Sequence, residues 1–227
     1  MKYHISFDLE LKDNPYKGKY IALEGIDGSG KSTQLHLVEK ALQKEGLSVI
    51  LTSEPKSDSV VGKIIRKVLS STIKMPSSAM QYLMSADRVI NHETIVKPAL
   101  QKGKVVLTHR SFWSVIPYGV MDRGLTQYDR ANAEVLMVAQ GLLSMYHQFI
   151  SPDVTFYLDV PIDVAMKRLV KMDKTKEIYE KKEKLTQIAK GYEWEMARFP
   201  GQFVRIDGTQ PEEKITEEIV KYVLGIK

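Results

Sequence analysis

A glycine-rich segment, residues 25–33, carries the residue types that bind phosphate. It matches the pattern G-x-x-x-x-G-K-[ST], with a short apolar strand pattern before it and a helical pattern after it. Glycines let backbone N–H groups approach phosphate oxygens, and the helix N-terminus adds the positive end of its dipole. In this pattern Lys31 reaches the outer phosphates and Ser32 holds Mg²⁺. The segment predicts a nucleotide site formed by Gly25, Ile26, Asp27, Gly28, Ser29, Gly30, Lys31, Ser32 and Thr33.

Charged residues also stand at the ends of three other expected strands. They are Glu54, His109, Arg110 and Asp159. Because open parallel sheets bind ligands at the carboxyl ends of their strands, we expect these side chains beside the phosphate site. Arg110 is the best candidate for an anion clamp, since a guanidinium binds phosphate through two parallel hydrogen bonds and stays charged. Asp159 has a second interpretation as the N-cap of the helix that Pro161 opens.

Two further basic features each have a functional and a structural interpretation. Arg88 either lines the same cleft from a helix or forms only a surface pair with Asp87, which contributes little. A basic stretch lies near residues 168–178, and its charged residues are Arg168, Lys171, Lys174 and Lys176. This stretch is either a lid over a triphosphate or a solvated face of the protein.

The elements that must position these residues alternate along the chain. Strand patterns occupy residues 19–24, 48–52, 104–108, 154–158 and 203–206. Helical patterns occupy residues 33–45, 58–70, 77–101, 128–150 and 178–196, and two more begin at Pro161 and Pro211. This order predicts a three-layer α/β fold of the P-loop NTPase type, a five-stranded parallel sheet with helices on both faces.

Residues 19–227 are expected to form one domain, preceded by an extension. In residues 2–12 apolar and polar side chains alternate, which is the period of a half-buried strand. The extension, residues 1–18, is predicted to add an edge strand to this sheet, or to pair with another subunit.

Composition narrows the class of protein. The 227 residues carry a formal charge of +5, which suits a polyanionic small molecule and gives no argument for a nucleic-acid partner. The chain has no cysteine, and no apolar run approaches the ~20 residues that span a bilayer. The N-terminus lacks a signal-peptide core. We therefore expect a cytoplasmic protein without a membrane partner.

Beyond the phosphate loop, five segments carry patterns that occur together in one family. They are Thr52-Ser53-Glu54-Pro55, Leu83-Met84-Ser85-Ala86-Asp87-Arg88 with His92, Pro98-Ala99-Leu100 with Gly103, residues 152–161, and Ile206-Asp207-Gly208-Thr209-Gln210. With the loop, these segments resemble the thymidylate kinase family of P-loop nucleoside monophosphate kinases, and the resemblance covers residues 19–225.

The resemblance implies transfer of the γ-phosphoryl group of ATP to dTMP, with Mg²⁺. It places ATP and Mg²⁺ on Lys31 and Ser32, and Asp27 near the acceptor sugar and phosphate. The acceptor residues that it implies are Glu54, Met84, Arg88, Arg110, Val115 and Tyr118. Among these, Arg110 holds the acceptor phosphate, Arg88 contacts the base, and Tyr118 packs against the deoxyribose. It also implies a homodimer through the helices near 58–70, 77–101 and 128–150.

The chain departs from the family pattern at its metal and base positions. His109 replaces an Asp that helps arrange the metal, and Glu54 or Asp159 are the candidates to compensate. Met84 replaces a stacking Phe, and Val115 replaces a polar residue near the base. The loop has no Arg, so lysines of the lid would carry that charge. Two alternatives stay open: a kinase for another acceptor, such as dUMP, a different nucleotide or a nucleoside, and a weakly active paralogue that only binds nucleotide.

Overall fold

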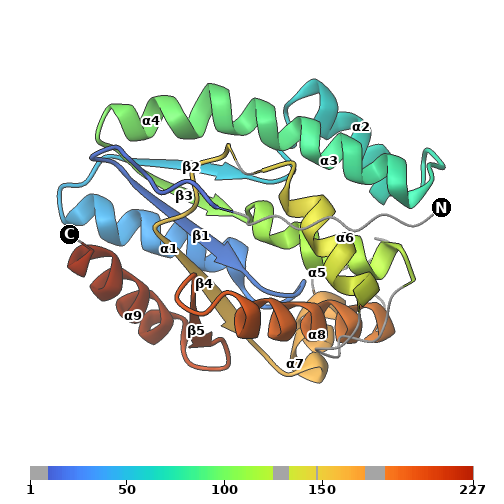
Figure 1. Ribbon diagram of the computed structural model, residues 1–227. Coiled ribbons are helices and arrows are strands. Elements are labelled where there is room, and N and C mark those ends of the chain that lie inside the picture. The colour runs from blue at the N-terminus through green and yellow to red at the C-terminus, as the bar shows by residue number, and fades with distance from the viewer. Residues whose placement is uncertain (1–9, 125–132, 147, 172–181, 227) are drawn as a thin grey trace.

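A five-stranded, all-parallel sheet forms the centre of the computed structural model, which describes residues 10–124, 133–146, 148–171 and 182–226 (Figure 1). Its strands are β1 (Lys19–Glu24), β2 (Val49–Ser53), β3 (Val105–His109), β4 (Val154–Asp159) and β5 (Phe203–Asp207). Their order across the sheet is β2-β3-β1-β4-β5. The predicted fold class is confirmed, and each strand lies within one residue of its predicted position.

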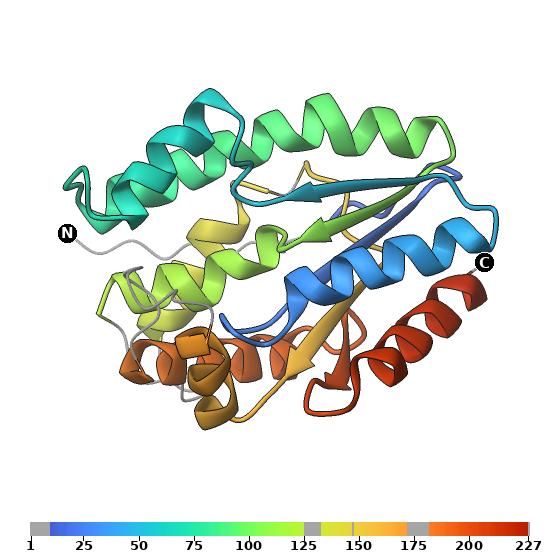
Figure 2. The ribbon, with the colours of Figure 1, turned by 180° about the vertical axis from the view of Figure 1, so that it is seen from behind.

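Helices cover both faces of this sheet. Their bounds are α1 (Lys31–Lys44), α2 (Val60–Leu69), α3 (Ser77–Asn91), α4 (Lys97–Gln101), α5 (Val115–Asp122), α6 (Ala133–Leu143), α7 (Ile162–Lys171), α8 (Lys182–Arg198) and α9 (Glu212–Gly225). α1 and α9 lie side by side on one face, as the view from behind shows (Figure 2). α4, α5 and α8 lie over the opposite face. No helix of the described residues is long and apolar enough to span a membrane.

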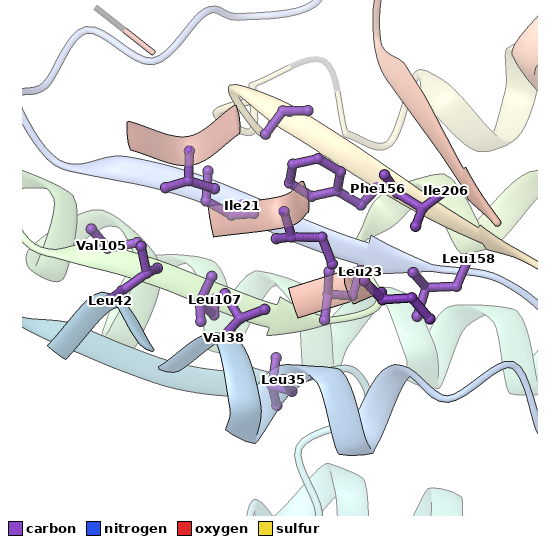
Figure 3. Packing of buried hydrophobic residues seen from close by; sticks show 14 residues of the cluster. Ile21, Leu23, Leu35, Val38, Leu42, Val105, Leu107, Phe156, Leu158 and Ile206 are labelled. Atoms are coloured by element: carbon purple, nitrogen blue, oxygen red, sulfur yellow. The ribbon is translucent and has the colours of Figure 1, made fainter. Parts of the chain in front are cut away.

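Alternation along the strands decides which side chains face which layer. In β1, Ile21 and Leu23 are fully buried against α1 and α9, where Val38 and Leu42 of α1 meet them (Figure 3). Tyr20 belongs to the cluster on the opposite face, so Glu24 also points to that face. A charged side chain at the end of β1 is thereby directed toward α5 and α8.

The register of the sheet places the ends of β1 and β3 side by side. Leu23 of β1 pairs with His109 of β3, and Asp159 pairs with Asp207. The chain turns out of β3 at Arg110, whose backbone N–H donates to the Leu23 carbonyl at 3.0 Å. The loop after β1 and the residues after β3 are therefore neighbours.

The structure differs from the expected elements at three places. Residues 112–122, which carried no helical prediction, form a 3₁₀ turn (Phe112–Ser114) and α5, with Pro117 in the first turn of α5, where its missing N–H costs no bond. The helix predicted for 128–150 ends at Leu143, and residues 125–132 lie outside the described part. Within residues 10–18 there is one isolated bridge, between Lys12 and Ile150, and residues 1–9 lie outside the described part.

Candidate active site

The glycine-rich loop joins β1 to α1, as the sequence pattern predicts. Gly28 has a φ of 83°, and a Cβ there would lie 2.5 Å from the carbonyl oxygen of Ala165 in α7. Gly30 has a φ of 102° and caps α1 at its N-terminus. Both positions need glycine, because a side chain would strain the backbone and, at Gly28, collide with α7. The loop is thus shaped by its contact with α7.

Lys31 is folded back over the loop that precedes it. Its ammonium group donates to the carbonyl oxygens of Gly25 and Ile26 at 2.9 and 2.8 Å, and the residue is 3% exposed. The Ile26 side chain is buried in the core, so Gly25 and Ile26 contribute backbone to the site. A phosphate that binds Lys31 must compete with these two carbonyls.

A cavity of about 520 Å³ opens in front of the loop. Its lining includes Asp27, Gly28, Ser29, Gly30, Lys31, Ser32, Thr33, Arg66, His109, Arg168, Lys171, Gly208 and Gln210. Arg168 joins two sides of this larger cavity, because its guanidinium donates to Ser29 O at 3.3 Å and to Gly208 O at 3.0 Å. Lys171, which the sequence assigns to the lid, lines it, whereas Lys174 and Lys176 lie outside the described residues.

A smaller cavity of about 130 Å³ lies beside the first one. It is lined by all six residues that the resemblance assigns to the acceptor, Glu54, Met84, Arg88, Arg110, Val115 and Tyr118. Further lining residues include Asp27, Arg66, Leu69, Met80, Gln81, His109 and Ser114. Thioether and aliphatic groups therefore share this space with charged groups and one side-chain amide.

The two cavities meet at Asp27, Arg66 and His109, which line both. Arg66 lies in α2, and the sequence interpretation missed it because nothing in the α2 pattern separates it from a surface arginine. A donor phosphate in the larger cavity and an acceptor in the smaller one would face each other at these three residues. This junction is the position where a phosphoryl group can pass between two ligands.

Arg110 is held from four sides with its φ at +70°, a value that non-glycine residues rarely adopt. Its guanidinium donates to Asp27 Oδ1 at 2.6 Å, to the Tyr192 hydroxyl at 2.9 Å and to Ser114 Oγ at 3.2 Å. The same group lies over the Tyr118 ring, 4.9 Å from its centroid. These contacts fix the guanidinium at the wall of the smaller cavity.

Glu24 anchors this arrangement from behind. Its side chain is fully buried and accepts hydrogen bonds from the Ser111 N–H at 2.7 Å, from Ser114 Oγ at 2.8 Å and from the Tyr192 hydroxyl at 2.7 Å. Glu24 Oε2 also lies 3.6 Å from the Arg110 guanidinium. Sequence interpretation missed this role, although a glutamate at the end of a buried strand is an unusual residue that signals a buried partner.

Electrostatics keep the junction in a defined protonation state. Burial alone would raise the pKa of Asp27, but Arg110 and Lys31 outweigh it and hold that pKa below its usual value. Burial, and then the charges of Lys31 and Arg110, lower the pKa of His109 well below 6.5. At neutral pH the junction therefore contains the Asp27 carboxylate and the neutral His109 imidazole, beside the cations of Lys31 and Arg110.

Arg88 pairs with Glu54 instead of Asp87. Its Nε donates to Glu54 Oε2 at 2.7 Å and its Nη1 donates to the Tyr146 hydroxyl at 3.2 Å, with both charged groups buried. Burial raises the pKa of Glu54, an effect that Arg88 opposes. Asp87 instead accepts from the Lys56 N–H and from Ser59 Oγ. The surface-pair interpretation of Arg88 is therefore wrong.

Oxygen donors for a divalent cation are few in the described residues. No group of three or more acidic or histidine side chains is arranged there to hold a metal ion. Ser32 and Asp27 both line the larger cavity. A hydroxyl and a carboxylate beside substrate phosphates fit Mg²⁺, which takes few protein ligands and keeps several waters. Asp159 is paired with Arg205 at 2.8 Å and lines neither cavity, so it does not compensate for His109.

The sequence of this chain is similar to those of known thymidylate kinases. A model of the thymidylate kinase family matches residues 23–219. The thymidylate kinase of Fervidobacterium nodosum is 33% identical over 202 residues, 89% of this chain and 96% of that protein. That of Thermoanaerobacter sp. strain X514 is 33% identical over 208 residues, 91% of this chain and 98% of that protein. That of Halothermothrix orenii is 38% identical over 153 residues, 67% and 69% of the two chains. The matched region contains the residues that line both cavities.

Proposed function

The chain belongs to the thymidylate kinase family, and on that premise we propose that it transfers the γ-phosphoryl group of ATP to dTMP, giving ADP and dTDP. The observation that carries this proposal is the junction of two cavities at Asp27, Arg66 and His109. Two nucleotides bound on either side of the junction bring donor and acceptor phosphates together. The reaction then needs positioning and charge neutralisation more than covalent chemistry.

The larger cavity is the ATP side in this proposal. The loop of residues 25–33 wraps the phosphates with backbone N–H groups, and Lys31 moves from the carbonyls of Gly25 and Ile26 to the outer phosphates. Arg168 holds the loop against the turn at Gly208, which favours a role in closing the adenine end of the cavity. Lys171 adds positive charge at its rim; the lid that the sequence predicts also includes Lys174 and Lys176, which lie outside the described residues.

The smaller cavity is the acceptor side. Arg110 binds the acceptor phosphate through its fork of N–H donors, and Asp27 orients that fork. Arg66 supplies a second cation where the transferred group carries most charge. Met84 and Val115 pack against the base, Arg88 donates to it, and Tyr118 packs against the deoxyribose. Glu54 keeps Arg88 in place.

Mg²⁺ is the metal that these residues fit, and when bound it neutralises charge on the phosphates. Ser32 provides its hydroxyl, as the sequence pattern predicts, and Asp27 lies in the same cavity. The remaining ligands would be phosphate oxygens and water. His109 is neutral and adds no negative charge to this set.

We also propose that the protein is a homodimer. Large apolar side chains are exposed on α2, α3 and α6, and they are Val60, Ile64, Tyr82, Val89, Ile90 and Met137. α2 packs against α3, so their outer surfaces are adjacent (Figure 1). Sedimentation equilibrium should give twice the chain mass, and Tyr82→Glu should lower it. A single-chain mass at all concentrations would contradict the dimer.

The activity itself is tested by incubating the protein with γ-labelled ATP, dTMP and Mg²⁺ and identifying the labelled product. Label is expected in dTDP, and omission of Mg²⁺ should abolish transfer. Lys31→Ala should remove activity while the variant stays folded, because the outer phosphates lose their cation. Label that remains in ATP or appears only as free phosphate would contradict the proposal.

A further inference from the structure

Gln81 is a buried amide in the smaller cavity that the sequence interpretation did not assign. It lies in α3 and is 6% exposed. Met84 and Arg88 follow it at three and seven residues, so all three share one face of the helix. All three line the cavity. The residue is therefore part of the wall against which the acceptor base is proposed to bind.

The orientation of this amide is fixed by its partner. Gln81 Nε2 donates to Asp122 Oδ2 at 2.9 Å. An ionised carboxylate only accepts hydrogen bonds, so the NH₂ end must face Asp122 and Oε1 must face away from it. Among the described residues nothing donates to Gln81 Oε1. The cavity wall thus contains the carbonyl acceptor of a largely buried residue, with no partner among the described residues.

α5 packs beside the amide at Gly119. A Cβ at Gly119 would lie 2.5 Å from Leu142 Cδ1 and 3.6 Å from Gln81 Cδ. Val115, one turn earlier in α5, lines the same cavity and offers no hydrogen bond. The hydrogen-bonding capacity that Val115 lacks is therefore present across the cavity, on α3.

Arg88 supplies the complementary donor. Its Nε and Nη1 are used by Glu54 and Tyr146, and no described residue accepts from Nη2. A donor and an acceptor on one helix face match the imide edge of thymine, where the O4 acceptor adjoins the N3–H donor. Cytosine presents the opposite order, an amino donor beside an N3 acceptor. The arrangement therefore favours a base whose N3 carries a proton, such as thymine, over a base whose N3 is an acceptor, such as cytosine.

We propose that Gln81 Oε1 accepts a hydrogen bond from N3–H of the acceptor base, and that Gln81 and not residue 115 selects thymine against cytosine in this chain. The proposal rests on the proposed function, because it names a specificity residue for that acceptor. Asp122 is its positioning residue, since it keeps the amide from turning over. An unpaired buried acceptor discriminates strongly between bases that can and cannot satisfy it.

The test compares dTMP with 5-methyl-dCMP, which has nearly the same shape and differs only at the imide edge. Wild-type protein is expected to prefer dTMP. Gln81→Met, of similar length, should lower kcat/KM for dTMP by about 30-fold and leave that for 5-methyl-dCMP unchanged or raised. Gln43→Leu, an exposed glutamine of α1, is the matched control and should change neither value.

A purely structural role of Gln81 would lower both values equally and leave their ratio unchanged. Asp122→Asn provides a second variant in which the amide can turn, and it should also lower the preference for dTMP. An unchanged ratio in both variants overturns the inference. Absence of dTMP phosphorylation by the wild-type protein would instead refute the proposed function, so the two failures are distinguishable.

Discussion

Arg110 and Asp27 form an ion pair at 2.6 Å that joins the residue after β3 to the phosphate loop after β1. Their side chains are 10% and 30% exposed, so the pair lies at the wall of the cavities and is partly shielded from water. Glu24, Ser114 and Tyr192 hold the same guanidinium from behind. The proposed acceptor-phosphate ligand is therefore positioned before any substrate binds, which reduces the reorganisation that transfer requires.

Replacement of Arg110 by lysine should impair use of the acceptor. Lysine keeps the charge but lacks the planar fork that contacts Asp27 and Tyr192 together. We expect kcat/KM for dTMP to fall by about 100-fold while the KM for ATP changes little. Steady-state kinetics measure both values. Arg205→Lys, in an exposed ion pair, is the control, and a similar loss there would remove the specific role of Arg110.

Glu24→Gln should destabilise the protein. The buried carboxylate accepts from Ser111, Ser114 and Tyr192, and an amide would present a donor to these donors. Removal of one partner from a buried charged network costs about 3–5 kcal/mol in the free energy of unfolding, measured by urea denaturation. Glu193→Gln, in an exposed pair, should change it by less than about 1 kcal/mol. Equal effects of the two variants would contradict the anchoring role.

His109 makes stability depend on pH in a defined direction. Its pKa is lowered in the folded protein by burial foremost, so below pH 6.5 the unfolded chain binds a proton that the folded protein does not. This contribution to stability is complete above pH 6.5 and is lost as the pH falls. Relative to His109→Asn, the wild-type protein should lose about 1 kcal/mol between pH 7.5 and pH 5.5. Parallel stability curves for the two proteins would show that His109 titrates normally.

Arg168→Lys should affect the ATP side alone. The guanidinium joins Ser29 O to Gly208 O, and one ammonium group does not span both. We expect the KM for ATP to rise about tenfold and the KM for dTMP to stay within twofold. Lys167→Ala, on the exposed side of α7, should change neither. A rise in the KM for dTMP instead would place Arg168 with the acceptor.

The strands and the phosphate loop could be predicted because their signals are local. Apolar runs bounded by glycine, proline and charged residues mark all five strands, and the loop pattern has four fixed positions. The continuous helical segment over residues 77–101 could also be predicted, although residues His92–Val96 within it form a π-helix. α5 was not predicted, because Pro117 and Gly119 interrupt its pattern and only packing against α6 and α8 makes it a helix.

The residues that position the site could not be predicted, because their partners are distant in sequence. Tyr192 and Glu24 are separated by 168 residues, and Gln81 and Asp122 by 41. In the sequence Gln81 is only a polar position of an amphipathic helix. Only Glu24, a charged residue at the end of a buried strand, indicates in the sequence that a buried partner lies nearby.

Preference for dTMP as the acceptor at the smaller cavity is tested most directly by kcat/KM for a panel of monophosphates with ATP and Mg²⁺. The panel contains dTMP, dUMP, dCMP, dAMP, dGMP and UMP. We expect the highest value for dTMP, a lower one for dUMP, which lacks the methyl group facing Met84 and Val115, and the lowest values for dCMP, dAMP, dGMP and UMP. A higher kcat/KM for any other member of the panel would contradict the claim.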